Sequence, residues 1–269
     1  MPTQLHPAPV IVTGGAAGIG YAIAHTFAAK GHKVGLVDLS ADKCNAAVIQ
    51  LIKDTGATVC SATADVSDPE SSKVAYDNIV SAIGPAGVLI NNAGFMPPRK
   101  GRIEEIPLDD FQQMMNVHVG GAVHWCRLAI PSMRERKFGR IINMSSVNAV
   151  QPVPHRYTYV TAKKALRGLT EALALDCARD GITVNAIAPG YILTDTLKER
   201  AEQGLLNQSA IAERTPAGRW GQPHEIAHIA QFLADPASAY ITGTTMTVDG
   251  GLSIRGDANE DLDNSPFSL

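Results

Sequence analysis

Two side chains with complementary acid/base properties stand one helical turn apart in the second half of the chain. Tyr159 and Lys163 lie four residues apart at the start of a segment with a helical pattern, so both side chains emerge on one face of the predicted helix. A tyrosine exchanges protons near neutral pH only when its phenolate is stabilised, and a nearby ammonium group provides that stabilisation. We therefore expect Tyr159 to be a general acid/base whose pKa is lowered by Lys163.

A serine lies 13 residues before this tyrosine, at the end of a predicted strand. Ser146 would hold a substrate oxygen by a hydrogen bond while Tyr159 transfers the proton. Neighbouring residues compete for these roles, because Ser145 also precedes the loop and Tyr157 lies two residues before Tyr159. Tyr157 has no lysine four residues later, and Lys164 is expected to point away.

Glycines separate the first apolar run from the first helical pattern, in the sequence TGGAAGIG (residues 13–20). At this place in an α/β protein, a dinucleotide pyrophosphate rests on free N–H groups at the start of a helix. Gly14 would permit the tight turn, Gly18 the approach of the phosphate, and Gly20 the close packing of helix on sheet. The spacing is GxxxGxG rather than GxGxxG, and a loop that only turns the chain is the alternative.

Asp38 ends the second apolar run, 18 residues after the last glycine of that loop. An acidic side chain there can accept both hydrogen bonds from an adenosine ribose, and it repels the 2′-phosphate of NADP. Neither Ala17 nor Leu39 supplies a compensating cation. We therefore predict NAD as the cofactor. A solvated side chain, or a cap on the helix that starts near Ser40, is the alternative for Asp38.

These residues require a sheet that brings strand ends and helix starts together. Because each crossover between parallel strands carries a helix back over the sheet, the regular alternation of strands and helices predicts one α/β domain over residues 1–269. Its expected form is a Rossmann-type, doubly wound parallel sheet of about seven strands with helices on both faces. The predicted strands are residues 9–12, 33–38, 58–65, 87–94, 139–146, 181–190 and 244–251, and the predicted helices include 19–30, 41–54, 69–83, 109–136 and 157–179.

Two segments fall outside this alternation. Residues 191–219 follow the sixth strand with a polar helical pattern. Because ligands bind beyond the carboxyl ends of parallel strands, we expect about 191–218 to form a substrate lid. Residues 257–269 are acidic and expected to be mobile.

Composition narrows the class of protein. With 45% apolar residues, 18% charged residues and a net charge of -3, we expect no nucleic-acid partner, and no apolar stretch is long enough to cross a membrane. The N-terminal residues lack the pattern of a targeting segment, so we expect a cytoplasmic protein. No Cys/His cluster suggests a bound metal, and the thiols are expected to be reduced and mostly buried; the cysteines are Cys44, Cys60, Cys126 and Cys177.

As a set, the motifs resemble the short-chain dehydrogenase/reductase family, in family order and spacing from about residue 8 to residue 252. The resemblance implies an oxidoreductase that transfers a hydride between NAD(H) and a secondary alcohol or carbonyl substrate. One departure is Ala149, where the family often has glycine. Besides TGGAAGIG, the motifs are Asp65-Val66, NNAG (91–94), Asn116, Ser146, YVTAK (159–163), PG (189–190) and YITGTTMTVDGG (240–251).

The resemblance also implies roles for single residues. Tyr159 would be the acid/base, and Lys163 would lower its pKa together with the positive nicotinamide ring while also binding the nicotinamide ribose. Ser146, rather than Ser145, has the usual spacing from Tyr159, and Asn116 would hold a water that links the lysine to solvent. The implied cofactor-binding residues are Gly14, Ala17, Gly18, Ile19, Gly20, Asp38, Leu39, Asp65 and Val66 at the adenine, Asn92, Ala93, Gly94, Tyr159, Lys163, Pro189, Gly190, Ile192, and Thr194 at the carboxamide.

Substrate specificity is expected from residues 96–105, from residues 147–157 and from the lid. Cations in the two loops would suit a carboxylate or sulfonate, although solvated or subunit-contact residues are the alternative. Asn148 resembles the family position that points into the substrate pocket, which favours a polyol, sugar or hydroxy acid. The loop cations are Arg99, Lys100, Arg102, His155 and Arg156, and the candidate substrate residues are Asn148, His155, Arg156 and Tyr191.

The resemblance further implies a homotetramer, in which helices 109–136 and 157–179 pair across a two-fold axis and the TTMTVDGG strand makes a second interface. A non-catalytic NAD-binding sensor or scaffold is the alternative from another class, but pure binding would not need Ser146, Tyr159 and Lys163. An epimerase or dehydratase of the extended family is a further alternative, which the GxxxGxG spacing disfavours.

Overall fold

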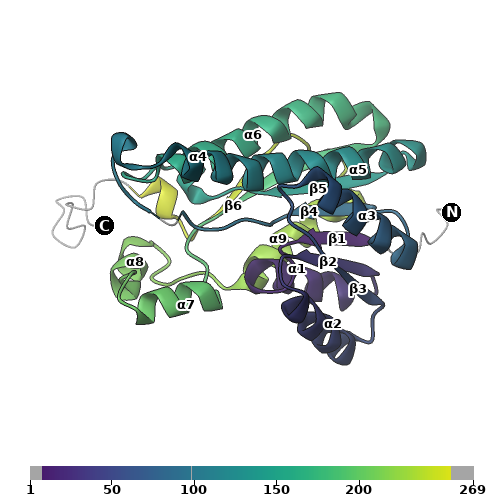
Figure 1. Ribbon diagram of the computed structural model, residues 1–269, viewed down its shortest axis with the longest axis horizontal. Coiled ribbons are helices and arrows are strands. Elements are labelled where there is room, and N and C mark those ends of the chain that lie inside the picture. The colour runs from purple at the N-terminus through teal and green to yellow at the C-terminus, as the bar shows by residue number, and fades with distance from the viewer. Residues whose placement is uncertain (1–7, 98, 256–269) are drawn as a thin grey trace, which may run out of the picture.

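The predicted alternation of strands and helices produces a parallel sheet. The computed structural model describes residues 8–97 and 99–255. In these residues, seven parallel strands are ordered β3-β2-β1-β4-β5-β6-β7 (Figure 1). This confirms the predicted doubly wound fold and the single domain. The strands are β1 (Val10–Thr13), β2 (Val34–Asp38), β3 (Val59–Thr63), β4 (Val88–Asn91), β5 (Gly139–Met144), β6 (Ile182–Pro189) and β7 (Thr245–Val248).

Successive residues of each strand point to opposite faces, so the sheet packs against two cores. Val10 and Val12 of β1 face a core formed with α1, α2 and α9, whereas Ile11 faces a core formed with α3, α5 and α6. The two groups of helices lie on opposite sides of the sheet in Figure 1. These helices are α1 (Gly18–Ala28), α2 (Ala41–Thr55), α3 (Pro69–Ile83), α5 (Gly121–Arg136), α6 (Tyr157–Cys177) and α9 (Pro223–Ala234).

The strand order reverses between β1 and β4, and open α/β sheets bind their ligands in the crevice at such a point. β1 ends at Thr13, directly before the glycine-rich loop, and β4 ends within the NNAG motif. The topology therefore brings the two predicted cofactor motifs to the same edge of the sheet.

The expected continuous helix over residues 109–136 is wrong in detail. α4 (Leu108–Met115) is followed by a π-helical segment, Asn116–Gly120, before α5 begins. The Gly121 N–H donates to the Asn116 carbonyl five residues earlier. The apolar pattern runs through both helices, so it gives no sign of this irregularity, which lies at a predicted catalytic residue.

The segment after β6 forms two short helices, as its polar pattern predicts. α7 (Asp195–Glu202) and α8 (Gln208–Arg214) contain no buried residue and stand apart from the helices that cover the sheet (Figure 1). The helix that follows, α9, is missing from the sequence-based prediction. Its signal is present, because Ile226, Ala230 and Leu233 recur on one face and Pro223 occupies the first turn.

The remaining sequence-based expectations concern membrane-spanning helices, metal ligands, the cysteines and the acidic tail. Within residues 8–97 and 99–255, no helix is both long enough and apolar enough to span a bilayer, and no cluster of three or more metal-ligating side chains is found. Cys44, Cys126 and Cys177 are buried and Cys60 is half-buried, all as free thiols, as expected. The acidic tail, residues 257–269, lies outside the described residues.

Candidate active site

The glycine-rich loop has the backbone that its glycines were expected to allow. Gly14 and Gly18 both adopt positive φ angles, of 62° and 55°. A Cβ at Gly20 would collide with the Gly14 carbonyl oxygen, so only glycine permits this packing of α1 against the loop. No side chain caps the start of α1, where Ala17 is the N-cap residue and Ile19 lies in the first turn. Free N–H groups therefore face the crevice.

The NNAG motif holds this loop in place. Asn92 Nδ2 donates to the carbonyl oxygens of Thr13 and Gly14, at 3.0 and 2.9 Å. The N–H groups of Asn92 and Ala93 both donate to Thr13 Oγ1 at 3.1 Å. The motif thus ties the end of β4 to the end of β1, which accounts for its expected support of the sheet.

Asp38 lies beside the glycine-rich loop at the end of β2. Its Oδ2 accepts a hydrogen bond from the Ala16 N–H at 3.3 Å, and its Oδ1 accepts from the Leu39 N–H at 2.9 Å. Ser40, not Asp38, caps α2. The carboxylate is therefore fixed next to the loop, while Leu39 is 70% exposed.

Asp65 and Val66, the residues predicted to contact the adenine, follow β3. Asp65 Oδ1 accepts hydrogen bonds from the N–H and hydroxyl of Ser67, so this exposed side chain is used in a local turn. Val66 is buried, and a Cβ at Gly121 would lie 2.9 Å from its side chain. The structure places both residues at the carboxyl end of β3, beside the start of α5.

Tyr159, Lys163 and Ser146 meet at the carboxyl end of β5. Lys163 Nζ lies 5.6 Å from the centre of the Tyr159 ring and donates a 2.7 Å hydrogen bond to the Met144 carbonyl. Ser146 precedes a short turn, Val147–Ala149, and its Oγ accepts from the Asn148 N–H at 3.2 Å. The turn forms with Ala149 where the family often has glycine.

The competing residues have structural positions of their own. The Ser145 hydroxyl donates to the Lys163 carbonyl at 2.9 Å, so it anchors α6 to the end of β5. Tyr157 stacks on Phe111 of α4, with ring centres 6.1 Å apart. Lys164 is exposed, as expected. These contacts leave Ser146 as the serine that faces Tyr159.

Burial changes the proton affinities of the pair. It lowers the pKa of Lys163 to about 7, because the ammonium group is removed from water. It also raises the pKa of Tyr159, against the lowering effects of the Ser146 hydrogen bond and the Arg156 charge; Tyr191 adds to the increase. In the protein itself, desolvation outweighs the Ser146 hydrogen bond and the Arg156 charge, and the lowering of the Tyr159 pKa by Lys163 together with the nicotinamide ring stays a prediction.

Asn116 begins the π-helical segment, which packs against α6. Its carbonyl is taken by the Gly121 N–H, and its side chain is exposed. π-Helical turns of this kind often occur at functional sites, because the extra residue redirects the side chains around it. The structure brings the segment to α6, and the predicted water-binding role of Asn116 stays a prediction.

His118, in the same π segment, is the site residue that sequence reasoning missed. It is 3% exposed, and its ring lies edge-on to the Tyr159 ring, with centres 5.8 Å apart. Its Nε2 lies 3.2 Å from the Phe95 nitrogen and 3.1 Å from the Phe95 oxygen. A Cβ at Gly94 would collide with this ring. Burial and the Lys163 charge hold the pKa of His118 well below 6.5, so a neutral imidazole joins the NNAG loop to the tyrosine.

The segment after β6 returns to the glycine-rich loop. A Cβ at Gly190 would lie 2.8 Å from Asp249 Cα, and Ile192 is buried. Thr194 caps α7, and its Cγ2 lies 3.3 Å from where a Cβ at Gly18 would sit. The predicted carboxamide residue therefore faces the start of α1 across the crevice. Pro189 ends β6.

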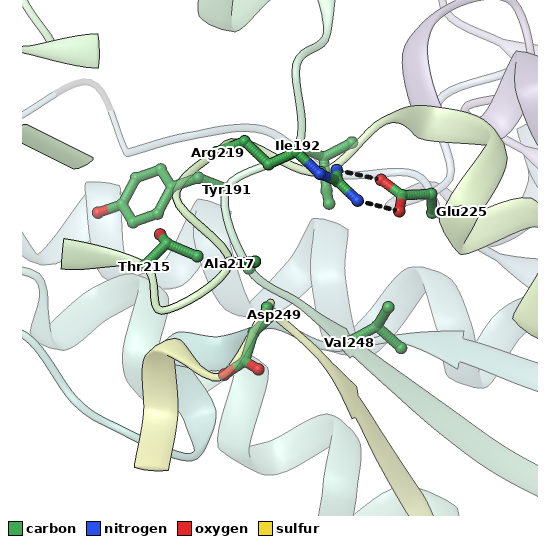
Figure 2. A pocket seen from close by; sticks show the side chains of 11 residues that line it. Tyr191, Ile192, Thr215, Ala217, Arg219, Glu225, Val248 and Asp249 are labelled. Atoms are coloured by element: carbon green, nitrogen blue, oxygen red, sulfur yellow. Dashed lines mark hydrogen bonds and ion pairs between the residues drawn. The ribbon is translucent and has the colours of Figure 1, made fainter. Parts of the chain in front are cut away.

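A cavity of about 60 Å³ lies at the base of the lid (Figure 2). Tyr191, Ile192 and Asp249 are among its lining residues, and the Arg219–Glu225 ion pair lies along one side. Two 2.8 Å hydrogen bonds from Arg219 lower the pKa of Glu225 to about 2. The volume suits a few water molecules rather than a substrate. The cavity therefore lies where the lid segment joins the rest of the domain.

The candidate substrate residues lie in two segments, and one residue of each, Arg156 and Tyr191, acts on Tyr159. Asn148 is buried beside Ser146. His155 has a positive φ of 61°, unusual for a residue other than glycine, and Arg156 follows it directly before α6. Tyr191 packs against Trp220, with ring centres 5.6 Å apart. Charge effects from Arg156 and Tyr191 on the phenol place both near Tyr159.

The crevice between these elements fits a nicotinamide dinucleotide. A Cβ at Gly14 would press against Asn92 and Ala93 and one at Gly18 would approach Thr194, and the uncapped start of α1 can receive a pyrophosphate. Asp38 stands at the end of β2, beside the glycine-rich loop, where an acidic side chain can accept hydrogen bonds from a ribose. Lys163, whose Nζ donates to Met144, keeps further donors for a second ribose.

Comparisons with known proteins agree with this geometry. A family model described as enoyl-(acyl carrier protein) reductase matches residues 14–253. An uncharacterised oxidoreductase of Bacillus subtilis is 39% identical over 254 residues, covering 93% of this chain and 92% of that protein. Glucose 1-dehydrogenase of Gluconobacter oxydans is 38% identical over 249 residues, covering 92% of each. L-Sorbose reductase of Gluconobacter frateurii, solved with NADPH and L-sorbose, has a TM-score of 0.86 at 33% identity, covering 94% of this chain and 99% of that one.

Proposed function

Because the chain belongs to the short-chain dehydrogenase/reductase family, we propose that it transfers a hydride between NAD(H) and a secondary alcohol or the corresponding ketone. The observation that carries this proposal is the meeting of Tyr159, Lys163 and Ser146 at the end of β5, with Lys163 Nζ 5.6 Å from the Tyr159 ring. This set supplies a proton donor or acceptor, a cation and a hydrogen-bond donor within reach of one substrate oxygen.

In alcohol oxidation, the Tyr159 phenolate takes the hydroxyl proton, and the Ser146 hydroxyl holds the substrate oxygen. In ketone reduction, the neutral Tyr159 returns that proton to the oxygen. A bound nicotinamide would supply the hydride acceptor or donor, and the positive charge of its oxidised ring would favour the phenolate of Tyr159. Lys163 adds its charge while it is protonated and donates to the ribose, and Asn116 holds the water through which the proton reaches solvent.

The cofactor choice proposed here is NAD. Asp38 supports it, since its carboxylate is fixed beside the glycine-rich loop by the Ala16 N–H and would repel a 2′-phosphate. The exposed neighbour Leu39 offers no cation in compensation. L-Sorbose reductase was solved with NADPH, so a direct comparison of the two cofactors is the decisive measurement.

A polyol, sugar or hydroxy acid is the proposed substrate class. Asn148 is buried next to Ser146, where its amide can read a second hydroxyl, and the relatives include a glucose dehydrogenase and an L-sorbose reductase. The test is a panel of alcohols, sugars and hydroxy acids assayed with NAD and with NADP by the absorbance of the reduced cofactor. Turnover of no member with either cofactor would contradict the proposal and favour the binding-only alternative.

We also propose a cytoplasmic homotetramer. Leu175 on α6 and Leu108 on α4 are 83% and 79% exposed, on the helices expected to pair across a two-fold axis. Tyr240, at full exposure, precedes the half-buried edge strand β7. Free thiols suit a reducing compartment. Light scattering at micromolar concentration should give the mass of four chains, and a monomer would contradict this assembly.

A further inference from the structure

Three cationic side chains converge from three separate segments near Tyr159. Lys100 lies in the loop after β4, Arg156 directly precedes α6, and Arg200 lies in α7. A 3.3 Å hydrogen bond from the Gly101 N–H to the His155 carbonyl joins the first two segments. The loops that carry Lys100 and Arg156 are therefore held together, and the charges of Arg156 and of Arg200 in α7 both act on Lys100.

The nearby cations differ in whether a carboxylate neutralises them. Arg99 forms two 3.0 Å hydrogen bonds to the carboxylate of Asp110. In the described part of the chain, Lys100, Arg156 and Arg200 form neither an ion pair nor a side-chain hydrogen bond. The pKa of Lys100 is lowered, by the charge of Arg156 first, then by burial and by the charge of Arg200. No carboxylate contributes to that shift.

This arrangement costs free energy unless an anion relieves it. Like charges held close together repel, and here Arg156 and Arg200 are half-buried while Lys100 is exposed. The left-handed backbone of His155, which sets the direction of Arg156, is a further local strain of the kind that folded proteins retain at ligand sites. The charge repulsion and the backbone strain both occur in the segment next to the proposed acid/base.

We propose that Lys100, Arg156 and Arg200 form the binding site for a carboxylate of the substrate, so that the enzyme acts on a hydroxy acid or sugar acid in preference to a neutral polyol. The inference rests on the proposed hydride transfer at Tyr159. Arg156 lies three residues before Tyr159 and its charge acts on that phenol, so a carboxylate bound there would lie near the reacting hydroxyl. Arg200 belongs to the lid, so the same anion would draw α7 over the substrate.

Matched substrate pairs test this site, each pair differing only by a carboxylate in place of a CH2OH group. Suitable pairs are gluconate and sorbitol, 3-hydroxybutyrate and 1,3-butanediol, and lactate and 1,2-propanediol. At low ionic strength, we expect the carboxylate member of a reactive pair to have a kcat/KM about 10-fold higher or more, the gain from one hydrogen bond to a charged group.

Charge-removing variants then identify the residues. Lys100→Gln and Arg200→Gln should each lower kcat/KM for the carboxylate member by about 10-fold, mainly through KM, and leave the neutral member nearly unchanged. Lys198→Gln is the matched control, because Lys198 lies on the same helix as Arg200 and pairs with Asp195 at 3.4 Å. It should change neither substrate.

The possible failures are distinguishable. Neutral members that react as well as their carboxylate partners, or equal losses on both members in the two variants, would overturn the carboxylate site and leave hydride transfer intact. Turnover of no pair with either cofactor would count against the proposed function. Calorimetric titration of gluconate, 3-hydroxybutyrate and lactate then decides: binding that Lys100→Gln removes and Lys198→Gln keeps supports the site, and no binding to the wild type overturns it.

Discussion

The crevice above β1 and the segment after β6 are held by different kinds of contact. Around the glycine-rich loop, Thr13, Gly14 and Asn92 are joined by hydrogen bonds of 2.9 to 3.1 Å, and Gly14, Gly15 and Gly20 leave no room for a Cβ. The lid helices α7 and α8 bury no residue. Trp220 anchors their base, through its contact with Tyr191 and a 3.0 Å hydrogen bond to the Gln208 carbonyl.

This difference in packing assigns cofactor geometry to the crevice and substrate choice to the lid. A close-packed, hydrogen-bonded crevice can hold reacting atoms in a fixed relation, whereas a loosely packed segment can change its residues or its position at little cost in stability. The cations proposed to read the substrate lie on the loosely packed side and on the loops beneath it. We therefore expect substitutions in the crevice to affect catalysis and folding, and substitutions in the lid to affect specificity.

The largest effect should come from the acid/base itself. Tyr159→Phe removes the group that transfers the proton, so kcat should fall by at least about 100-fold, the lower end for a positioned acid/base. Cofactor binding, measured by the fluorescence of the reduced nucleotide, should persist because Lys163 is retained.

Tyr157→Phe is the matched control for this substitution. The Tyr157 ring stacks on Phe111, and a phenylalanine keeps that contact, so most activity should remain. If Tyr157→Phe abolished turnover while Tyr159→Phe stayed active, the assignment of the acid/base would be wrong.

The second largest effect should be a difference in stability between a crevice variant and a lid variant. A Cβ at Gly20 would collide with the Gly14 carbonyl and lie 2.6 Å from Asn92 Nδ2, so Gly20→Ala should destabilise the protein by about 1–3 kcal/mol. Leu205→Ala in the lid, at a residue 52% exposed, should change stability by less than about 0.5 kcal/mol. Thermal unfolding followed by circular dichroism measures both, and equal losses would contradict the contrast drawn here.

Cofactor preference should change by a smaller factor. With Asp38 in place, kcat/KM with NAD should exceed that with NADP by at least about 10-fold, which corresponds to about 1.4 kcal/mol. Asp38→Ala should reduce this ratio, because the carboxylate that repels the 2′-phosphate is gone. Initial rates with both cofactors test it. Equal efficiency in the wild type would refute the role given to Asp38.

The same contrast explains what the sequence could predict. The strands and helices, the glycine turn and the one-turn spacing of Tyr159 and Lys163 follow from periodicity and local spacing, because each depends on residues close in the chain. His118 and the π segment do not, since they depend on how α5 meets Val66 and how Gly94 approaches the ring. The direction of the Tyr159 pKa shift also depends on burial from several elements, and Arg200 joins Lys100 and Arg156 only through the folded lid.

The smallest predicted effect concerns pH. Oxidation requires the Tyr159 phenolate, and burial raises the pKa of that phenol, so the oxidation rate of a neutral alcohol should rise with pH through the alkaline range. Reduction requires the protonated phenol and should decline over the same range.

Arg156→Gln removes a charge that lowers the pKa of Tyr159, so the oxidation profile should move to higher pH, by less than about one pH unit for a single partly solvated charge. Measuring kcat with a neutral alcohol keeps the effect separate from carboxylate binding. Ser146, Tyr191, Lys163 and His118 also surround the phenol, and their retention in the variant means that any shift reports the arginine. Lys198→Gln should leave the profile in place, and a shift to lower pH in Arg156→Gln would show that the arginine does not act on the phenol as proposed.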